Sequence, residues 1–213
     1  MGVQVRLLAL LLGGAVLLAG CGTTEFVPGD TTQPRATFVP DEQLDPPVEI
    51  PDPTAISIPK LGVQSTLEPL GLTPEGALEV PPVDDPGQAA WYAGAKPDVD
   101  GDEFKPGSED GPAIISGHVD GTGPNGQHGF PGVFAKLTEL APGDQILVDR
   151  EDGSQLKFVV TAVERYSKAD LPWDKIMGPI DKPALRLITC GGDFDLAARH
   201  YKDNVVTYAE LAA

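Results

Sequence analysis

The chain has 213 residues, of which 41% are hydrophobic, so it can bury the core of one domain with some length to spare. It carries 32 acidic against 15 basic residues and a formal net charge of -17, which disfavours a nucleic-acid partner and predicts a solvated acidic surface. Only two cysteines occur, Cys21 and Cys190, and the first lies in a segment typical of targeting, so we expect no intramolecular disulfide.

The first residues are typical of a secretory signal. An uncharged apolar run from Leu7 to Ala19 follows Arg6, and it is shorter than the roughly 20 residues that span a bilayer. The run ends in Leu-Ala-Gly-Cys21, which resembles a bacterial lipobox and implies that residues 1–20 are removed and Cys21 is lipidated. An uncleaved signal anchor is the alternative. Two acyl chains on Cys21 would give stable attachment, which we expect at the extracytoplasmic face of the membrane.

A linker is predicted from residue 21 to residue 53. Between Gly22 and Pro53 the chain has seven prolines, seven acidic residues and a single basic residue, with no sustained apolar period. This composition is typical of a tether, so residues 54–213 are predicted to form the folded domain.

Residues 97–111 are rich in acidic residues, glycine and proline. The spacing of Asp98, Asp100 and Asp102 resembles the start of a calcium loop, but the glycine and the distal glutamate that such a loop needs are missing. We therefore expect a solvated surface loop and no metal, with calcium binding as the alternative.

The globular part is predicted to be all-β. From Ala55 onward, short alternating or apolar runs are separated by Gly and Pro turns, and about eight strands emerge. The later strands are expected at 145–149, 156–163, 184–190 and 203–208, and Asp152-Gly153 between the first two is a strong hairpin signal. Residues 130–140 are expected to form a short helix. The pattern favours a barrel or a sandwich.

Cys190 and His118 are the candidate catalytic pair. Cys190 stands where a predicted strand ends at two glycines, and His118 follows a second apolar strand. A thiol attacks as the thiolate, so it needs a base nearby and a donor for the oxyanion that it creates.

The motifs around these residues resemble those of the sortases, the Gram-positive cysteine transpeptidases, over residues 56–209. They are Leu-Ile-Thr189-Cys190, Gly-His118-Val-Asp, Arg199, and Tyr-x-Asp-Asn-Val-Val from residue 201. The run Thr-Cys-Gly-Gly-x-Phe-Asp is most similar to class F, found in actinobacteria.

The resemblance implies a closed eight-stranded barrel with one or two short helices, no cofactor and a monomer. It implies that Cys190 attacks the Thr carbonyl of a Leu-Pro-x-Thr-Gly-like sorting signal on a secreted protein and forms a thioacyl enzyme. An amino nucleophile from a cell-wall precursor or a protein then takes the acyl group. In this scheme His118 moves the proton, Arg199 holds the oxyanion and Thr189 contacts the substrate.

Two features depart from the family pattern. Arg186 stands where the family's five-residue motif has threonine, and the usual membrane helix is replaced by the lipobox. We expect Arg199 rather than Arg186 to serve the oxyanion. An eight-residue loop after Cys190 would bring Arg199 back level with the end of the cysteine strand.

Two other functions stay open. An L,D-transpeptidase-like cell-wall enzyme also pairs cysteine with histidine, although its motif places an arginine close after the cysteine, where this chain has glycines. A non-catalytic lipoprotein that binds a ligand in its barrel is the second.

Overall fold

The computed structural model describes residues 49–74, 76–94 and 104–213. The predictions for the signal peptide, for Cys21 and for Asp98, Asp100 and Asp102 lie outside the described residues. The strands are β1 (Pro53–Ile58), β2 (Val63–Leu70), β3 (Ala89–Tyr92), β4 (Ala113–Gly117), β5 (Asp120–Thr122), β6 (His128–Pro131), β7 (Gln145–Arg150), β8 (Gln155–Ser167), β9 (Ala184–Asp195) and β10 (His200–Leu211). The helical turns are η1 (Pro59–Leu61), η3 (Leu137–Glu139), η4 (Lys168–Asp170) and the short α1 (Trp173–Ile176).

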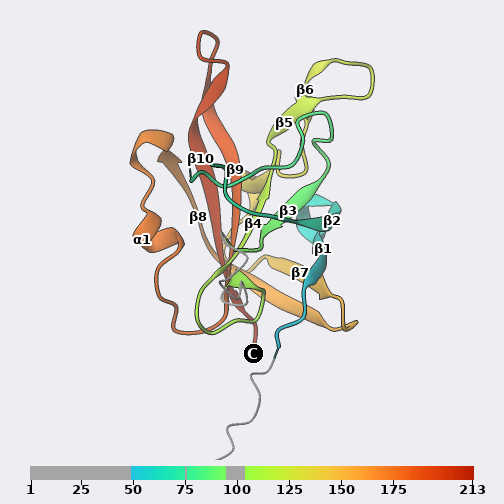
Figure 1. Ribbon diagram of the computed structural model, residues 1–213, viewed down its shortest axis with the longest axis vertical. Coiled ribbons are helices and arrows are strands. Elements are labelled where there is room, and N and C mark those ends of the chain that lie inside the picture. The colour runs from blue at the N-terminus through green and yellow to red at the C-terminus, as the bar shows by residue number, and fades with distance from the viewer. Residues whose placement is uncertain (1–48, 75, 95–103) are drawn as a thin grey trace, which may run out of the picture. The chain divides into compact units, whose positions relative to one another are not determined.

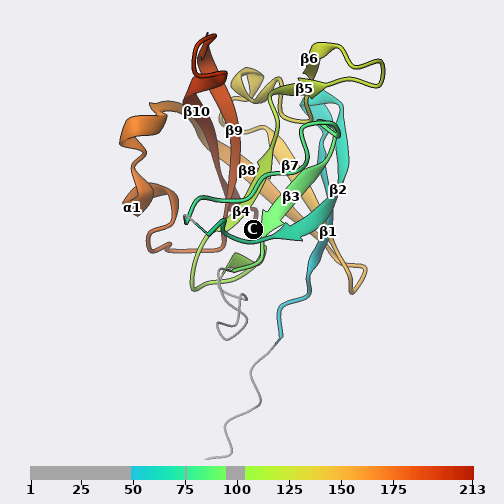
Figure 2. The same ribbon diagram turned by 45° about the horizontal axis from the view of Figure 1, so that its top comes forward.

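Eight strands close into a barrel in the order β1-β2-β3-β4-β9-β10-β8-β7, and β1 pairs with β7 to close the ring (Figures 1 and 2). Most neighbours are antiparallel, but β2 runs parallel to β3 and β4 runs parallel to β9. β5 and β6 form a separate two-stranded ribbon, the yellow-green arm of Figure 1. The predicted fold class, a closed all-β barrel with short helices, is confirmed.

The helix predicted for residues 130–140 is wrong. Phe130 and Pro131 pair with β5 in the ribbon, and only η3 near the end of the range is helical. Pro131 and Gly132 explain the difference, because proline lacks a backbone donor and glycine weakens a helix. Phe134 and Leu137 are buried, since their turn packs against the barrel interior.

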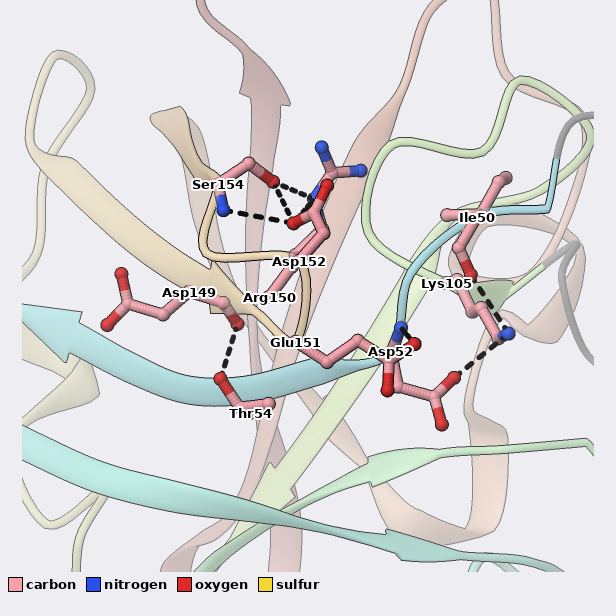
Figure 3. A network of polar contacts seen from close by, with 9 residues as sticks. All are labelled: Ile50, Asp52, Thr54, Lys105, Asp149, Arg150, Glu151, Asp152 and Ser154. Carbon is pink, nitrogen blue, oxygen red and sulfur yellow. Dashed lines mark hydrogen bonds and ion pairs between the residues drawn. The ribbon is translucent and has the colours of Figure 1, made fainter.

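The hairpin predicted at Asp152-Gly153 is confirmed between β7 and β8. Gly153 has a φ of 79°, which is the left-handed conformation that the turn requires. The Asp152 carboxylate accepts hydrogen bonds from the backbone and the hydroxyl of Ser154, at 2.9 and 2.5 Å. These bonds lower the pKa of Asp152, and they are the cluster at the top of Figure 3.

The same hairpin holds the beginning of the domain (Figure 3). The backbone amide of Asp52 donates to the Glu151 carboxylate, and the Thr54 hydroxyl donates to the Asp149 carbonyl at 3.2 Å. Lys105 adds an ion pair with Asp52 at 2.9 Å. The chain therefore joins the barrel at the end away from the β9–β10 turn (Figures 1 and 2).

Two apolar clusters lie on the two faces of the barrel wall. The interior cluster includes Ile56, Phe158, Leu185 and Leu187, whereas Ile188 belongs to a second cluster outside, with Ile114, Ile176 and Tyr208 among its members. Successive residues of a strand point to opposite faces, so β9 contributes to both clusters. Within the described part of the chain, none of the helices has the length and apolar character needed to cross a bilayer.

Candidate active site

His118 directly follows β4 and lies level with Cys190 on the neighbouring strand β9. β4 and β9 are parallel, with Ser116 opposite Ile188, and each catalytic candidate follows two residues later. Adjacent strands stand about 4.8 Å apart. Two residues that are distant in sequence are therefore brought together by a single pair of strands.

The backbone of His118 is held by close packing. Its carbonyl accepts a 3.0 Å hydrogen bond from Phe134, and Gly132 donates to the Val119 carbonyl at 2.9 Å. A Cβ on Gly132 would lie 2.2 Å from the His118 carbonyl oxygen, and one on Gly117 would lie 2.5 Å from Val133. Glycine at these positions lets the segment that follows β6 pack directly against the backbone of the histidine.

The imidazole of His118 has one fixed partner. Its Nε2 lies 2.6 Å from the Pro81 carbonyl oxygen, in the segment that connects β2 and β3. A carbonyl oxygen can only accept, so Nε2 carries the hydrogen and Nδ1 is left to exchange a proton with a reacting group. Sequence reasoning missed Pro81, because nothing in a proline-rich loop marks a carbonyl as the partner of a distant histidine.

Cys190 is half-buried and faces a cation. Lys168 Nζ lies 3.4 Å from Cys190 Sγ and donates to it. Lys168 begins η4, directly after β8, and β8 pairs with β10, which in turn pairs with β9. An ammonium at this distance stabilises a thiolate. The sequence offers no signal for this lysine, because it becomes a neighbour of Cys190 only through the barrel.

A mostly apolar groove of 340 Å³ opens at Cys190 and His118. We call it the Cys190 groove. One wall is the β2–β3 segment, with Leu78 and Val80, and the other is the segment of α1, with Trp173 and Ile176. Val80 and Trp173 are more than 40% exposed, at 58% and 45%. Exposed apolar side chains gathered around a thiol are typical of a site that binds an apolar ligand.

Thr189 lies on the opposite face of β9 from the thiol. It is 4% exposed and pairs with Val205, which belongs to the interior cluster. Its hydroxyl oxygen is buried and has no hydrogen-bond partner within the described part of the chain, although the residue contributes to the edge of the Cys190 groove. The predicted substrate contact of Thr189 stays a prediction.

Arg199 is not level with Cys190. β9 continues to Asp195 and β10 begins at His200, so the predicted eight-residue loop is a four-residue turn. Cys190 pairs with Asn204, which puts Arg199 roughly 16 Å further along the ladder. The expectation drawn from loop length is therefore wrong, because the ladder runs on through Gly191 and Gly192. Arg199 is exposed, with a φ of 55°, at the tip of the red hairpin in Figure 1.

Arg186 lies on the outer face of the barrel. Its guanidinium carbon is 4.7 Å from the centre of the Tyr208 ring, and burial lowers its pKa. Arg186 does not contribute to the Cys190 groove. Among the described residues, no three His, Cys, Asp or Glu side chains are grouped so as to hold a metal ion.

The comparisons with known proteins agree with this geometry. Residues 56–212 match the family model described as the sortase domain. Sortase C1 from Streptococcus agalactiae has the same fold, with a TM-score of 0.52 and 17% identity over 75% of this chain and 67% of that one. Sortase C from Clostridium perfringens SM101 gives a TM-score of 0.50 and 14% identity over 78% of this chain and 73% of that one. No match is found among curated protein sequences.

Proposed function

Because this chain belongs to the sortase family of cysteine transpeptidases, we propose that Cys190 and His118 carry out the family's reaction on a sorting signal. The observation that carries the proposal is the parallel β4–β9 pair, which sets the two residues level at one groove. The Cys190 thiolate attacks the peptide carbonyl, and His118 gives a proton to the departing amine as the C–N bond breaks. The thioacyl enzyme remains.

The sorting signal lies in the Cys190 groove in this proposal. Leu78, Val80 and Trp173 offer apolar contacts, which suit the Leu and Pro side chains of a Leu-Pro-x-Thr-Gly-like peptide. Thr189 at the edge of the groove is proposed as a contact to the peptide. The acyl group then passes to an amino nucleophile on a cell-wall precursor or a protein.

The oxyanion needs a cation or a set of hydrogen-bond donors. Lys168, 3.4 Å from Sγ, is near the position where the tetrahedral oxygen forms. We also propose Arg199 for this role, in a substrate complex where the β9–β10 turn bends toward Cys190. In support, Arg199 makes no ion pair with any described residue, so its guanidinium is free to meet the substrate.

The proposals for the sortase class and the membrane anchor rest on motifs in the sequence. The Thr-Cys-Gly-Gly-x-Phe-Asp run supports class F, and Leu-Ala-Gly-Cys21 supports a lipid anchor at the extracytoplasmic face of a Gram-positive membrane. A monomer is proposed, since a single chain carries Cys190, His118 and Lys168 in one groove.

The test is to trap the thioacyl enzyme. Purified protein is incubated with a library of sorting-signal peptides, quenched in acid and analysed by mass spectrometry. We expect an adduct on Cys190 with the mass of the acyl fragment, and its release by hydroxylamine. Cleavage of the peptide by Cys190→Ala at the wild-type rate would contradict the proposal.

A further inference from the structure

A second cavity, larger than the Cys190 groove, lies between two hairpins. It has a volume of 690 Å³ and is lined by the β5–β6 ribbon on one side and by the β9–β10 hairpin on the other. We call it the Asp120 cavity, after the acidic residue in its wall. In Figure 1 the two hairpins are the yellow-green and red arms that extend beyond the barrel.

The lining of the Asp120 cavity combines a carboxylate with exposed apolar side chains. Phe194 is 46% exposed and Leu196 is 86% exposed, and Val83 on the facing segment is 57% exposed. Phe194 also packs edge-on against Tyr201, with ring centres 5.1 Å apart. His128 completes the titratable groups of the wall, together with Asp120, Tyr201 and Arg199. Arg199 lies in the same wall but forms no ion pair with Asp120 or with any other described residue. The Asp120 carboxylate beside apolar surface is therefore left to a ligand that is cationic at one end and aliphatic behind it.

The carboxylate of Asp120 is held in place. Tyr201 donates its hydroxyl hydrogen to Asp120 Oδ2 at 2.5 Å, a contact that joins the two hairpins across the cavity. This hydrogen bond, with burial of the ring, raises the pKa of Tyr201 to about 12, so the phenol remains a donor. The second carboxylate oxygen has no partner within the described part of the chain, and it is available to a ligand.

The Asp120 cavity adjoins the nucleophile. Tyr201 lines both this cavity and a smaller hollow of 170 Å³ that Cys190 also lines. Asp120 comes two residues after His118. No described residue lines both the Cys190 groove and the Asp120 cavity. A peptide in the groove therefore leaves the cavity open to a second substrate.

We propose that the Asp120 cavity binds the acceptor, and that this acceptor is a primary amine on an aliphatic arm of the lysine type. This inference rests on the proposed function. The Asp120 carboxylate attracts the ammonium, and Phe194, Leu196 and Val83 contact the methylene groups behind it. The net charge of -17 also favours a cationic partner.

The transfer step balances with the groups present. The ammonium loses one proton to solvent, and the neutral amine attacks the thioester carbonyl. A C–N bond forms, the C–S bond breaks and the thiolate of Cys190 returns. The second proton of the amine passes to His118, which became neutral when it protonated the first leaving group.

The experiment measures how the thioacyl enzyme divides between hydrolysis by water and aminolysis by the added amine. The purified protein receives a sorting-signal peptide with either Nα-acetyl-lysine amide or triglycine amide, and the hydrolysed and aminolysed products are quantified by mass spectrometry. We expect the lysine amine to be the better acceptor. Asp120→Asn should raise the KM for this amine about tenfold, the value of one charge contact, and leave hydrolysis of the peptide unchanged.

The control variants distinguish a loss of acceptor binding from a general disturbance of the fold. Glu68→Gln removes an exposed carboxylate on β2, outside the cavity, and should change neither product. Asp120→Glu keeps the charge and should restore part of the affinity. Equal loss of hydrolysis and aminolysis in Asp120→Asn, or an unchanged KM, would overturn the acceptor site. Failure of the unmodified protein to cleave the peptide at all would overturn the proposed function with it.

Discussion

At the scale of single residues, the contact between Lys168 and Cys190 has the most direct chemical consequence. The ammonium lies 3.4 Å from the sulfur and Lys168 is half-buried, so its charge would stabilise both a thiolate and the oxyanion that we propose to form beside it. Arginine keeps this charge, whereas methionine keeps only the length of the side chain.

Lys168→Met should slow both alkylation of Cys190 by iodoacetamide and formation of the thioacyl enzyme. Loss of one oxyanion donor costs about 10²- to 10³-fold in turnover. Lys168→Arg should recover part of the rate. The matched control is Lys157→Met on β8, an exposed lysine away from the groove, which should react like the unmodified protein. Unchanged rates of alkylation and of thioacyl formation in Lys168→Met would show that the contact between Lys168 and Cys190 does not contribute to reactivity.

Arg199 and Arg186 are expected to differ sharply. Arg199→Ala should slow thioacyl formation by about 10²- to 10³-fold if the β9–β10 turn brings the guanidinium to the oxyanion, which is the outcome we expect. Arg186→Ala should stay within about tenfold, because Arg186 stacks on Tyr208 outside the groove and supplies no oxyanion donor. Single-turnover rates measure both. An Arg199→Ala protein that loses only acceptor affinity would assign Arg199 to the Asp120 cavity instead.

The sequence predicts the identity of the candidate catalytic residues better than it predicts the contacts that hold them. The apolar runs that lead to His118 and to Cys190 are visible in the sequence, although β9 continues beyond Cys190 to Asp195. The partners Pro81 and Lys168 are not, since each contact depends on a loop that returns to the barrel from elsewhere. The predicted position of Arg199, level with Cys190, is wrong for a similar reason. The glycines after Cys190 predict the end of a strand, whereas Gly192, with a φ of 71°, continues the ladder through a register shift.

At the scale of elements, the strand pattern was largely predictable and the helical segments were not. Alternation and the Asp-Gly turn determine β7 and β8, because both signals are local. α1 has only four residues, too few to leave a helical period in the sequence. Its position depends instead on Lys175, which bonds both carboxylate oxygens of Glu164 on β8 at 2.7 Å.

The contact between Lys175 and Glu164 predicts that acid loosens α1. Hydrogen bonds from Lys175 and Tyr166 hold the pKa of Glu164 below its ordinary value of 4.5. A carboxyl whose pKa is lower in the folded state adds stability above its unfolded pKa, and this stability is lost as pH falls through the folded pKa. Amide exchange of residues 168–177 should therefore rise below about pH 4.5 relative to the barrel strands. Glu164→Gln should flatten this dependence, and an unaltered acid response in that variant would contradict the assignment.

Gly132 is predicted to be essential for the position of His118. Alanine would place a Cβ 2.2 Å from the His118 carbonyl oxygen, a clash with backbone that only a shift of the turn can relieve. We expect Gly132→Ala to lower the free energy of unfolding by about 1–3 kcal/mol and to reduce the rate of thioacyl formation more than tenfold. The control is Gly153→Ala, which has open space but a φ of 79°. It should cost about 1–2 kcal/mol and leave activity unchanged.

At the scale of the whole molecule, the lipobox-like run Leu-Ala-Gly-Cys21 predicts that the protein is attached to the membrane through Cys21. Two acyl chains on one residue give stable anchoring, whereas the apolar run alone is short for a span. Cys21→Ser expressed in a Gram-positive host should release the protein to the medium, as measured by the ratio of protein in membrane and culture fractions. An intact Met1 in membrane-bound wild-type protein would exclude the lipobox.

The parallel pairing of β4 with β9 also bears on how the enzyme becomes active after synthesis. Contacts between segments far apart in sequence form slowly, because the chain must close a long loop before they stabilise it. The β7–β8 hairpin, closed by one tight turn, has no such delay. During refolding we therefore expect amide protection to appear first in β7–β8, and reactivity of Cys190 with iodoacetamide to reach its native rate only when β9 joins β4. Catalytic competence is then a late event of folding, and a newly synthesised chain passes through a stage in which it has secondary structure and a Cys190 thiol that does not yet react.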